Sequence, residues 1–431
     1  MNVKTKYFLF SLLLLSELVY LFIYTSYNLP IVNFTIVSLF NSIVFVIIWI
    51  LIKDKFVSRT WLFLIIASGI LFRLTMLPAN PIASDDIYRY IWDGKVMSNG
   101  INPFRYAPAD KELNFLHSEM LPSKVNHPEM KTIYPPYSQF IFFLSYKLFG
   151  ESFLGIKIFL LLSELLTMFL LIALINILKL PSQNIVLYAI CPLPIMQFMI
   201  DGHIDGTGFP ILLLTILLFL NKRKISSSLM MGLSITTKFI SGMILPFIWK
   251  EEKGKWKIYT VVLPILSILV LYIPFYSGNV FPLESLFQFS SNWIANSSVF
   301  SIIFFIVKDN QDARLIALLL FLLSGLILFI SKKTFQDKLY LIFFLFLLFS
   351  PTVHPWYLTW LALFLPLSFR WSGLIFIVLV NLINILLIDY ITQNIWYTFH
   401  WLMIIEYTPV IILFVYEIFL FKRNSQAKLN N

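Results

Sequence analysis

Long apolar segments separated by short polar ones follow one another along nearly the whole chain. A helix needs about 20 apolar residues to cross the hydrocarbon of a bilayer. The pattern therefore predicts an all-α polytopic membrane protein, one domain over residues 1–431, with about 12 transmembrane helices. The candidate segments are 7–25, 31–52, 60–77, 152–178, 184–200, 208–220, 258–276, 313–331, 336–351, 356–369, 371–389 and 399–421. Residues 7–52 supply two helices at the N-terminus, and residues 313–421 supply the C-terminal set.

Charges between the apolar segments set the expected orientation. With Lys4 and Lys6 in the cytoplasm, strict alternation places most later basic runs on the same side, as the positive-inside rule requires. Both termini are then cytoplasmic. Residues 226–249 break the pattern, because strongly basic runs flank them on both ends. A re-entrant hairpin over 226–249 resolves the conflict and places Lys238 inside the membrane.

Composition narrows the class of protein further. Hydrophobic residues make up 59% of the 431 residues and charged residues 13%, which is more apolar surface than one soluble core buries. The formal charge of +10 lies in short runs between apolar segments, which favours membrane topology over nucleic acid as its cause. The single cysteine, Cys191, excludes a disulfide or a cysteine-based metal site within the chain.

The expected outer loop, residues 78–138, contains the densest polar cluster. Residues 84–98 have helical spacing, with Asp86 and Arg89 on a polar face and Ile87 and Ile91 on the other. We expect an interfacial helix whose apolar face rests on the membrane. Other polar segments on the same side are 201–206, 277–314, 353–357 and 389–398.

Two adjacent carboxylates at the start of that helix suggest acid–base chemistry. Partial desolvation next to a like charge raises the pKa of a carboxyl group, which suits a general base. The alternative is structural: Asp85 caps the helix, and Asp86 pairs with Arg89 or Lys95.

Cations in apolar surroundings raise the question of a buried anion. Lys238 is a candidate to bind one, unless it pairs with a carboxylate such as Glu164. Arg73, near a helix end, either binds an anion or extends its head group to water.

Two histidines lie in polar turns. His203 lies between two aspartates, which is a weak metal signature. His354 either polarises a phosphate or caps a turn.

Taken together, several strings resemble the GT-C class of membrane glycosyltransferases. Within that class, residues 60–420 look most like the polyprenyl-phosphate-mannose-dependent mannosyltransferases, including the phosphatidylinositol mannoside mannosyltransferases. The strings are DDIYRYIWDGKVMSNGINPFRY, HPEMKTIYPPYSQ, DGHIDG, ITTKF, SNWIANSSVF and HPWYLTW. Relatives commonly place the acidic loop after the first span, whereas here it follows the third. Two added helices keep it on the same side of the membrane.

The resemblance implies a set of roles. A residue of the acidic loop acts as general base, with Asp85 as first candidate and Asp86 as second. Inversion at the sugar follows from a single displacement, and the lipid-phosphate donor carries its own leaving group, so we expect neither metal nor other cofactor. The implied residues for donor phosphate and substrate are Arg89, Arg105, Tyr134, His203, Lys238, Asn292, Trp293 and His354.

The implied partners are a polyprenyl-phosphate sugar, a glycolipid or glycan acceptor and the lipid bilayer, in the inner (plasma) membrane of a bacterium. Two rivals stay open. A secondary transporter uses intramembrane charges and re-entrant hairpins as well, and an O-antigen ligase or polymerase also acts on lipid-linked sugars. A non-catalytic scaffold is the third reading, because fold alone does not establish activity.

Overall fold

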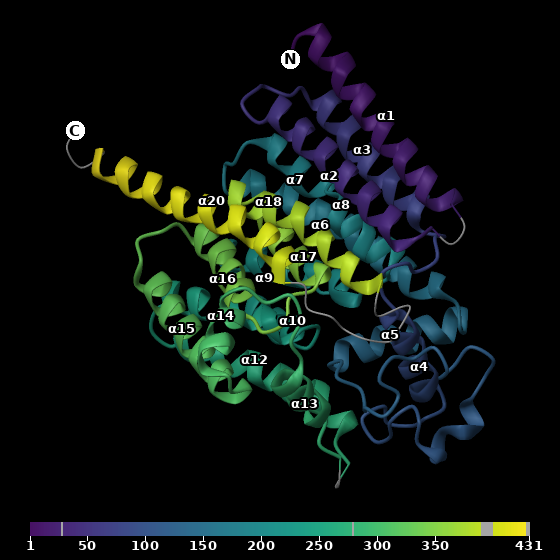
Figure 1. Cartoon of the computed structure of the whole chain (residues 1–431). Coiled ribbons are helices and arrows are strands. Elements are labelled where there is room, and N and C mark those ends of the chain that lie inside the picture. Colours follow the sequence, from purple (N-terminus) through teal and green to yellow (C-terminus); the bar gives the residue numbers. More distant parts are fainter. Residues whose placement is uncertain (27–28, 278–279, 389–399, 428–431) are drawn as a thin grey trace. The chain divides into compact units, whose positions relative to one another are not determined.

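A computed structural model describes residues 1–26, 29–277, 280–388 and 400–427, with the side chains of 400 and 421–427 excluded. The described residues form helices and loops, with no strand among them (Figure 1). The expected all-α class is therefore confirmed for this part of the chain. The expected outer segment 389–398 lies outside the described residues.

Helices of very different length follow one another along the chain. The first group is α1 (Val3–Thr25), α2 (Ile31–Ile52), α3 (Arg59–Met76), α4 (Asp86–Ser98), α5 (Pro136–Phe149), α6 (Phe153–Ile177), α7 (Val186–Ala189), α8 (Pro192–Ile195) and α9 (Phe209–Leu220). The second is α10 (Lys224–Ile235), α11 (Leu245–Glu251), α12 (Trp256–Tyr272), α13 (Glu284–Asn292), α14 (Val299–Val307), α15 (Asn310–Ile330), α16 (Phe335–Phe349), α17 (Pro355–Phe364), α18 (Trp371–Leu379) and α20 (His400–Ala427). Short segments of tighter or wider helix are η1 (Lys111–Leu116), η2 (Ser182–Ile185), η3 (Met196–Ile200), η4 (Ile204–Thr207), η5 (Phe239–Ile244), η6 (Ile273–Phe275) and η7 (Val380–Leu386).

Seven described helices are long and apolar enough to cross a membrane, so the chain is a multi-pass membrane protein. They are α1, α2, α3, α6, Trp256–Phe275, α15 and Trp401–Leu420. The segment 184–200 is broken, with a bend of 42° between Ser182–Ala189 and Pro192–Ile200, and it makes an eighth span if the two parts count as one. The other expected spans form shorter helices, so the count of about 12 stays a prediction.

The expected re-entrant segment, 226–249, is not one continuous helix. It is divided among α10, η5 and α11, and Lys238 lies at the break before η5 with extended backbone. The 12 residues of α10 extend about 18 Å, which is less than the hydrocarbon thickness of about 30 Å. A helix, a break and a second helix suit a hairpin, and its depth in the membrane stays a prediction.

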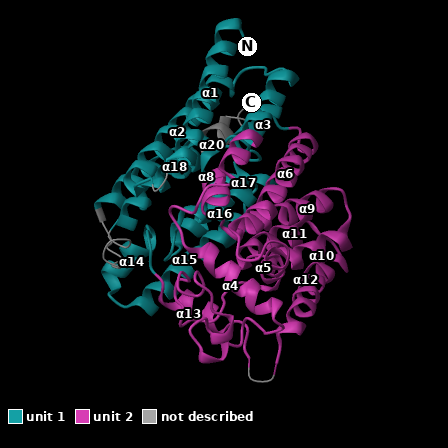
Figure 2. Ribbon diagram, turned by 90° about the vertical axis from the view of Figure 1, so that its right-hand side faces the viewer, with its two compact units in different colours: residues 1–69, 180–193, 294–431 teal, residues 70–179, 194–293 magenta. Residues whose placement is uncertain are grey.

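The chain divides into two compact units, each assembled from segments distant in sequence (Figure 2). Unit 1 comprises residues 1–69, 180–193 and 294–431, and unit 2 comprises residues 70–179 and 194–293. Within unit 1, α18 packs against α2 and α20. Unit 2 contains the acidic loop, the DGHIDG turn and the segment around Lys238.

The helix expected over 84–98 forms as α4, but the surroundings of its apolar face differ from the prediction. Ile87 and Ile91 are 0% and 2% exposed, so they are buried in protein and the expected contact with the membrane interface is wrong. The loop that follows α4 has apolar residues of its own, and Leu113 and Leu116 cluster with Ile91. Burying this face against protein removes it from solvent as effectively as a membrane would.

Two buried charges in unit 2 are paired with each other. Arg73, near the end of α3, donates from Nε and Nη2 to Glu164 Oε2 of α6 at 3.0 and 2.8 Å, and both side chains are 0% exposed. The expectation that Arg73 extends to water is therefore wrong. The alternative pairing of Lys238 with Glu164 is also wrong, since Lys238 binds Asp205. An ion fully removed from water needs a partner of opposite charge, and proximity in space selects it.

We predict that Glu164→Leu lowers the free energy of unfolding by about 3–5 kcal/mol, because Arg73 keeps its charge in a buried site. The double variant Arg73→Met/Glu164→Leu should lie within about 1 kcal/mol of wild type. Unfolding of the purified protein in detergent measures both. A double variant as unstable as the single one would show that packing, and not the unpaired charge, causes the loss.

Candidate functional site

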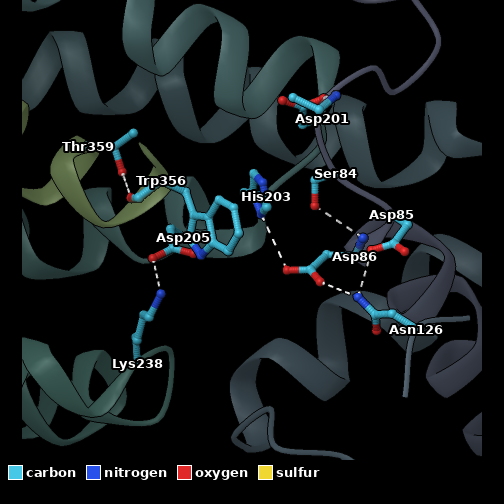
Figure 3. A network of polar contacts seen from close by, with 11 residues as sticks. Ser84, Asp85, Asp86, Asn126, Asp201, His203, Asp205, Lys238, Trp356 and Thr359 are labelled. Carbon is cyan, nitrogen blue, oxygen red and sulfur yellow. Dashed lines mark hydrogen bonds and ion pairs between the residues drawn. The ribbon is translucent and has the colours of Figure 1, made fainter. Parts of the chain in front are cut away.

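The acidic pair lies at the first turn of α4, where Asn126 joins its two carboxylates. Asp85 occupies the N-cap position, but its side chain makes no capping hydrogen bond, so the capping alternative is wrong. Asn126 Nδ2 donates to Asp85 Oδ1 and to Asp86 Oδ1, each at 2.8 Å (Figure 3). One amide thus bridges two groups that would otherwise repel each other.

The alternative ion pairs for Asp86 do not form either. Arg89 Nε binds Asp93 Oδ1 at 2.9 Å, four residues further along α4, and Lys95 Nζ binds Glu151 Oε1 at 2.6 Å. Both cations are therefore used by other carboxylates. Asp86 is left with Asn126 on one oxygen and the DGHIDG turn near the other.

That turn, residues 201–206, brings His203 to the acidic pair. His203 is fully buried, and its Nδ1 lies 3.6 Å from Asp86 Oδ2 (Figure 3). Gly202 has φ +73°, and a Cβ there would overlap Ile87 Cδ1 in the first turn of α4. Glycine is therefore required at 202 both by the backbone conformation and by the close approach to α4.

Lys238 belongs to the same region through Asp205, at the other end of the turn. Its Nζ binds Asp205 Oδ1, while 26% of its side chain stays exposed (Figure 3). A partly exposed ammonium whose position is fixed by a buried carboxylate can accept a further anionic group. The carboxylates of Asp86 and Asp205 also lie close enough to affect each other's charge.

Burial dominates the electrostatics of the pair. It raises the pKa of Asp86 to about 6, helped by the neighbouring charge of Asp85 and opposed by the hydrogen bond from Asn126. Burial also raises the pKa of Asp85, against the hydrogen bond from Asn126. Near neutral pH, Asp86 therefore remains mostly ionised yet accepts a proton more readily than an ordinary aspartate.

Tyr134, expected to contact substrate, packs beside the pair. Its ring meets that of Tyr90 edge-on, with centroids 5.0 Å apart. Burial raises the pKa of Tyr134 well above its usual value, and the charge of Asp86 adds to the effect. Gln139 fixes this segment to α4, since its Nε2 donates to Asp93 Oδ2 at 3.0 Å.

The other predicted residues have different surroundings. Arg105 is exposed and lies over the ring of Tyr106, 5.1 Å from its centroid. The ring of Trp293 packs edge-on against that of His127, with the ring centroids 4.8 Å apart. Asn292 is exposed at the end of α13.

His354 belongs to unit 1, and its ring stacks on that of Trp356 with the ring centroids 4.3 Å apart. It is therefore the one predicted residue outside unit 2.

The side chains of Asp201, His203 and Asp205 go to three different partners instead of converging on one point. Asp201 accepts backbone hydrogen bonds, His203 faces Asp86 and Asp205 binds Lys238. Over the described residues, no group of three or more His, Cys, Asp or Glu side chains is arranged to hold a metal ion.

Asn126 had no role in the sequence-based prediction, and Asp201 entered it only as one of the two aspartates beside His203 in a weak metal signature. Asn126 directly precedes the HPEMKTIYPPYSQ string, in a stretch where serine, lysine and asparagine are all ordinary loop residues. Its contact with residues 40 and 41 positions earlier exists only in the folded chain. The contacts of Asp201 with the loop before α4 likewise exist only in the folded chain.

The contact between Gly202 and Ile87 can be tested with a matched glycine. Gly202→Ala should lower the free energy of unfolding by about 1–2 kcal/mol because of the left-handed backbone. The overlap with Ile87 should lower it by a further 1–3 kcal/mol, roughly. Gly100→Ala is the control, because Gly100 has φ +75° with open space around it, and only the first cost applies. The double variant Gly202→Ala/Ile87→Val, which removes Cδ1, should recover the second part in an unfolding measurement. Equal losses at positions 100 and 202 would contradict a close contact.

One comparison with known proteins identifies a family. A family model described as alpha-(1->6)-mannopyranosyltransferase, N-terminal domain, matches residues 14–250, which is more than half of the chain and includes the acidic pair, the DGHIDG turn and Lys238. No curated protein matches, and no solved structure matches. The chain belongs to this family, and it is a membrane mannosyltransferase of the GT-C type.

Proposed function

We propose that the protein moves mannose from a polyprenyl-phosphate donor to a glycolipid or glycan acceptor, with inversion at the anomeric carbon. The family description adds that the bond formed is α-(1→6). The observation that supports the proposal best is the pair Asp85–Asp86, bridged by Asn126, with His203 and the Lys238–Asp205 ion pair beside it. A carboxylate base and a cation side by side are what transfer from a lipid phosphate needs.

The contacts favour Asp86 over Asp85 as the base, which reverses the order taken from the sequence. Asp86 Oδ2 faces His203, its pKa of about 6 is matched to work near neutral pH, and it adjoins Lys238 and Asp205. Asp86 takes the proton of the acceptor hydroxyl as that oxygen attacks the anomeric carbon. The bond from that carbon to the phosphate oxygen breaks, and the lipid phosphate leaves with the electron pair.

Lys238 is the best-placed cation for the phosphate that leaves. Its ammonium is fixed by Asp205 and remains partly exposed, so the developing negative charge meets a preformed partner. Arg105 and His354 remain further candidates for the phosphate, while Tyr134, Asn292 and Trp293 are candidates for sugar contacts. Arg89 supports Asp93 and holds the polar face of α4 in place. His203 orients Asp86. Because the donor carries its own leaving group, the proposal includes no metal or other cofactor.

The proposed location is the bacterial inner (plasma) membrane, with both termini in the cytoplasm and the site on the outer face. The basic residues Lys53 and Lys55 precede α3, Arg59 begins it, and the acidic loop follows its far end. A donor lipid in the outer leaflet then presents its phosphate at the level where α4 begins.

The rival readings have less support. Membership of a mannosyltransferase family argues against both the transporter and the O-antigen ligase or polymerase.

A transfer assay tests the base. With purified protein in nanodiscs, radiolabelled polyprenyl-phosphate-mannose and a lipid extract as acceptor source, Asp86→Asn should lower kcat by about 10²–10⁴-fold. Asp85→Asn should cost less, because it leaves the Asp86 base in place. Asp110→Asn is the control, since Asp110 lies in the same loop and caps the backbone N–H of Ala107 at 2.9 Å. Full activity of Asp86→Asn would exclude it as the base, and no transfer by the wild type would argue for a transporter.

The pH dependence of kcat/KM tests the role of Asn126, whose amide bridges Asp85 and Asp86. The hydrogen bond from Asn126 stabilises the ionised carboxylate and holds the pKa of Asp86 down to about 6, so its removal raises that pKa. The base acts when ionised, so in Asn126→Leu the acid limb of the kcat/KM profile should move to higher pH. Asn114→Leu, an exposed asparagine in the same loop, should leave the limb unchanged. A limb that stays in place in Asn126→Leu, or moves to lower pH, would count against Asp86 as the titrating group.

A further inference from the structure

A buried carboxylate that the proposed reaction does not use, Asp201, lies between the two chain segments that form the site. Asp201 is 0% exposed. Its Oδ1 accepts hydrogen bonds from the backbone N–H groups of Ile82 and Ala83, at 3.0 and 2.8 Å. These donors belong to the loop immediately before the acidic pair. One oxygen that binds two consecutive N–H groups fixes the direction of both peptide planes.

The three residues at the start of the turn all contact one short stretch of chain, residues 82–87. Asp201 binds residues 82 and 83, Gly202 packs on Ile87, and His203 faces Asp86. The main chain of the turn is itself anchored, because the N–H groups of residues 201 and 203 donate to carbonyls of η3 at 3.2 and 2.9 Å. The loop before α4 is therefore held against a rigid support.

A second buried group holds the same loop from another helix. Lys157 of α6 is 1% exposed, and its Nζ donates to the carbonyl oxygen of Ala79. The charge of Lys157 also acts on Asp201. Burial of two charged side chains beside residues 79–83 is costly unless their contacts are required.

The cost of burial is evident at the carboxylate of Asp201. Its second oxygen, Oδ2, is buried without a hydrogen bond over the described residues. Burial raises the pKa of Asp201 to about 6, and the two accepted backbone hydrogen bonds oppose the rise. An apolar side chain would avoid the penalty, and it would also leave the N–H groups of residues 82 and 83 without their acceptor.

We propose that Asp201 is a positioning residue: its carboxylate fastens the loop before α4 to the turn that bears His203, and so sets the separation of Asp86 from His203. The inference rests on the proposed function, because it takes Asp86 as the reacting carboxylate. Asp201 contacts neither substrate nor reacting atoms in this role. What it supplies is an acceptor at one fixed point, and the negative charge is secondary.

Two substitutions separate the acceptor from the charge. Asp201→Asn keeps a carbonyl oxygen at the Oδ1 position and should retain kcat within about tenfold. Asp201→Leu has similar bulk and no acceptor, and should lower kcat by about 10²-fold, with the donor KM changed less than about threefold. Asp201→Ala removes the acceptor without adding bulk and takes the place of Asp201→Leu if that variant does not fold.

The matched control is Glu164→Gln, which alters another fully buried carboxylate of unit 2, the partner of Arg73. Folded fraction is measured for every variant by thermal unfolding. A loss of kcat in Asp201→Leu that exceeds its loss of folded protein, with Glu164→Gln showing no such excess, supports the proposal. A loss equal to the folded fraction lost, or an Asp201→Asn as inactive as Asp201→Leu, overturns it.

A readout independent of transfer keeps this inference separate from the proposed function. The rate at which a water-soluble carbodiimide modifies Asp86, followed by mass spectrometry of the peptide, reports how the carboxylate is held. The rate should rise at least about threefold in Asp201→Leu and stay near wild type in Asp201→Asn, as expected when a buried group loses its support. An unchanged rate in Asp201→Leu overturns the positioning role. Full transfer activity of Asp86→Asn would remove the proposed base and leave the labelling result to decide the positioning.

Discussion

The structure of the site depends on keeping two adjacent carboxylates together in a place with little water. Burial makes the charges of Asp85 and Asp86 costly, and the charge of Asp85 adds to the cost for Asp86. The amide of Asn126 offsets part of this cost by donating to both. The part of the cost that Asn126 does not offset raises the pKa of Asp86 to about 6, and this pKa suits a general base near neutral pH. The burial that opposes folding, together with the repulsion from Asp85, thus prepares Asp86 for its proposed chemistry.

Around this pair, three cations of unit 2 bind other carboxylates. Arg89 binds Asp93, Arg73 binds Glu164, and Lys238 is fastened by Asp205. A direct ion pair with Asp86 would lower its pKa and weaken it as a base. The pairing of the other charges therefore preserves the reactivity of the acidic pair, and it leaves Lys238 partly exposed for an anionic group.

The support beneath the pair is built from backbone contacts as much as from side chains. Gly202 allows the turn to touch α4, and Asp201 holds the loop that leads into it. Both contacts act on groups a few residues from Asp86, so small displacements there would reach the carboxylate directly. Reactions that depend on orientation lose rate steeply with such displacements. The residues that the family model matches, 14–250, contain every one of these contacts.

The sequence by itself determined the class of the protein: an all-helical membrane protein, a helix over 84–98, and an acidic pair at its start in a mannosyltransferase-like loop. These features depend on local periodicity and on the order of residues, which a linear chain displays. Tertiary structure decided which charges pair and what covers each face. Arg73 and Glu164 are 91 residues apart in sequence, and Asn126 and Asp85 are 41 residues apart. The same holds for α4, whose apolar face packs against a protein loop where periodicity alone allowed a membrane surface. A buried group takes whichever partner the fold brings within hydrogen-bonding distance, and no local pattern encodes that distance.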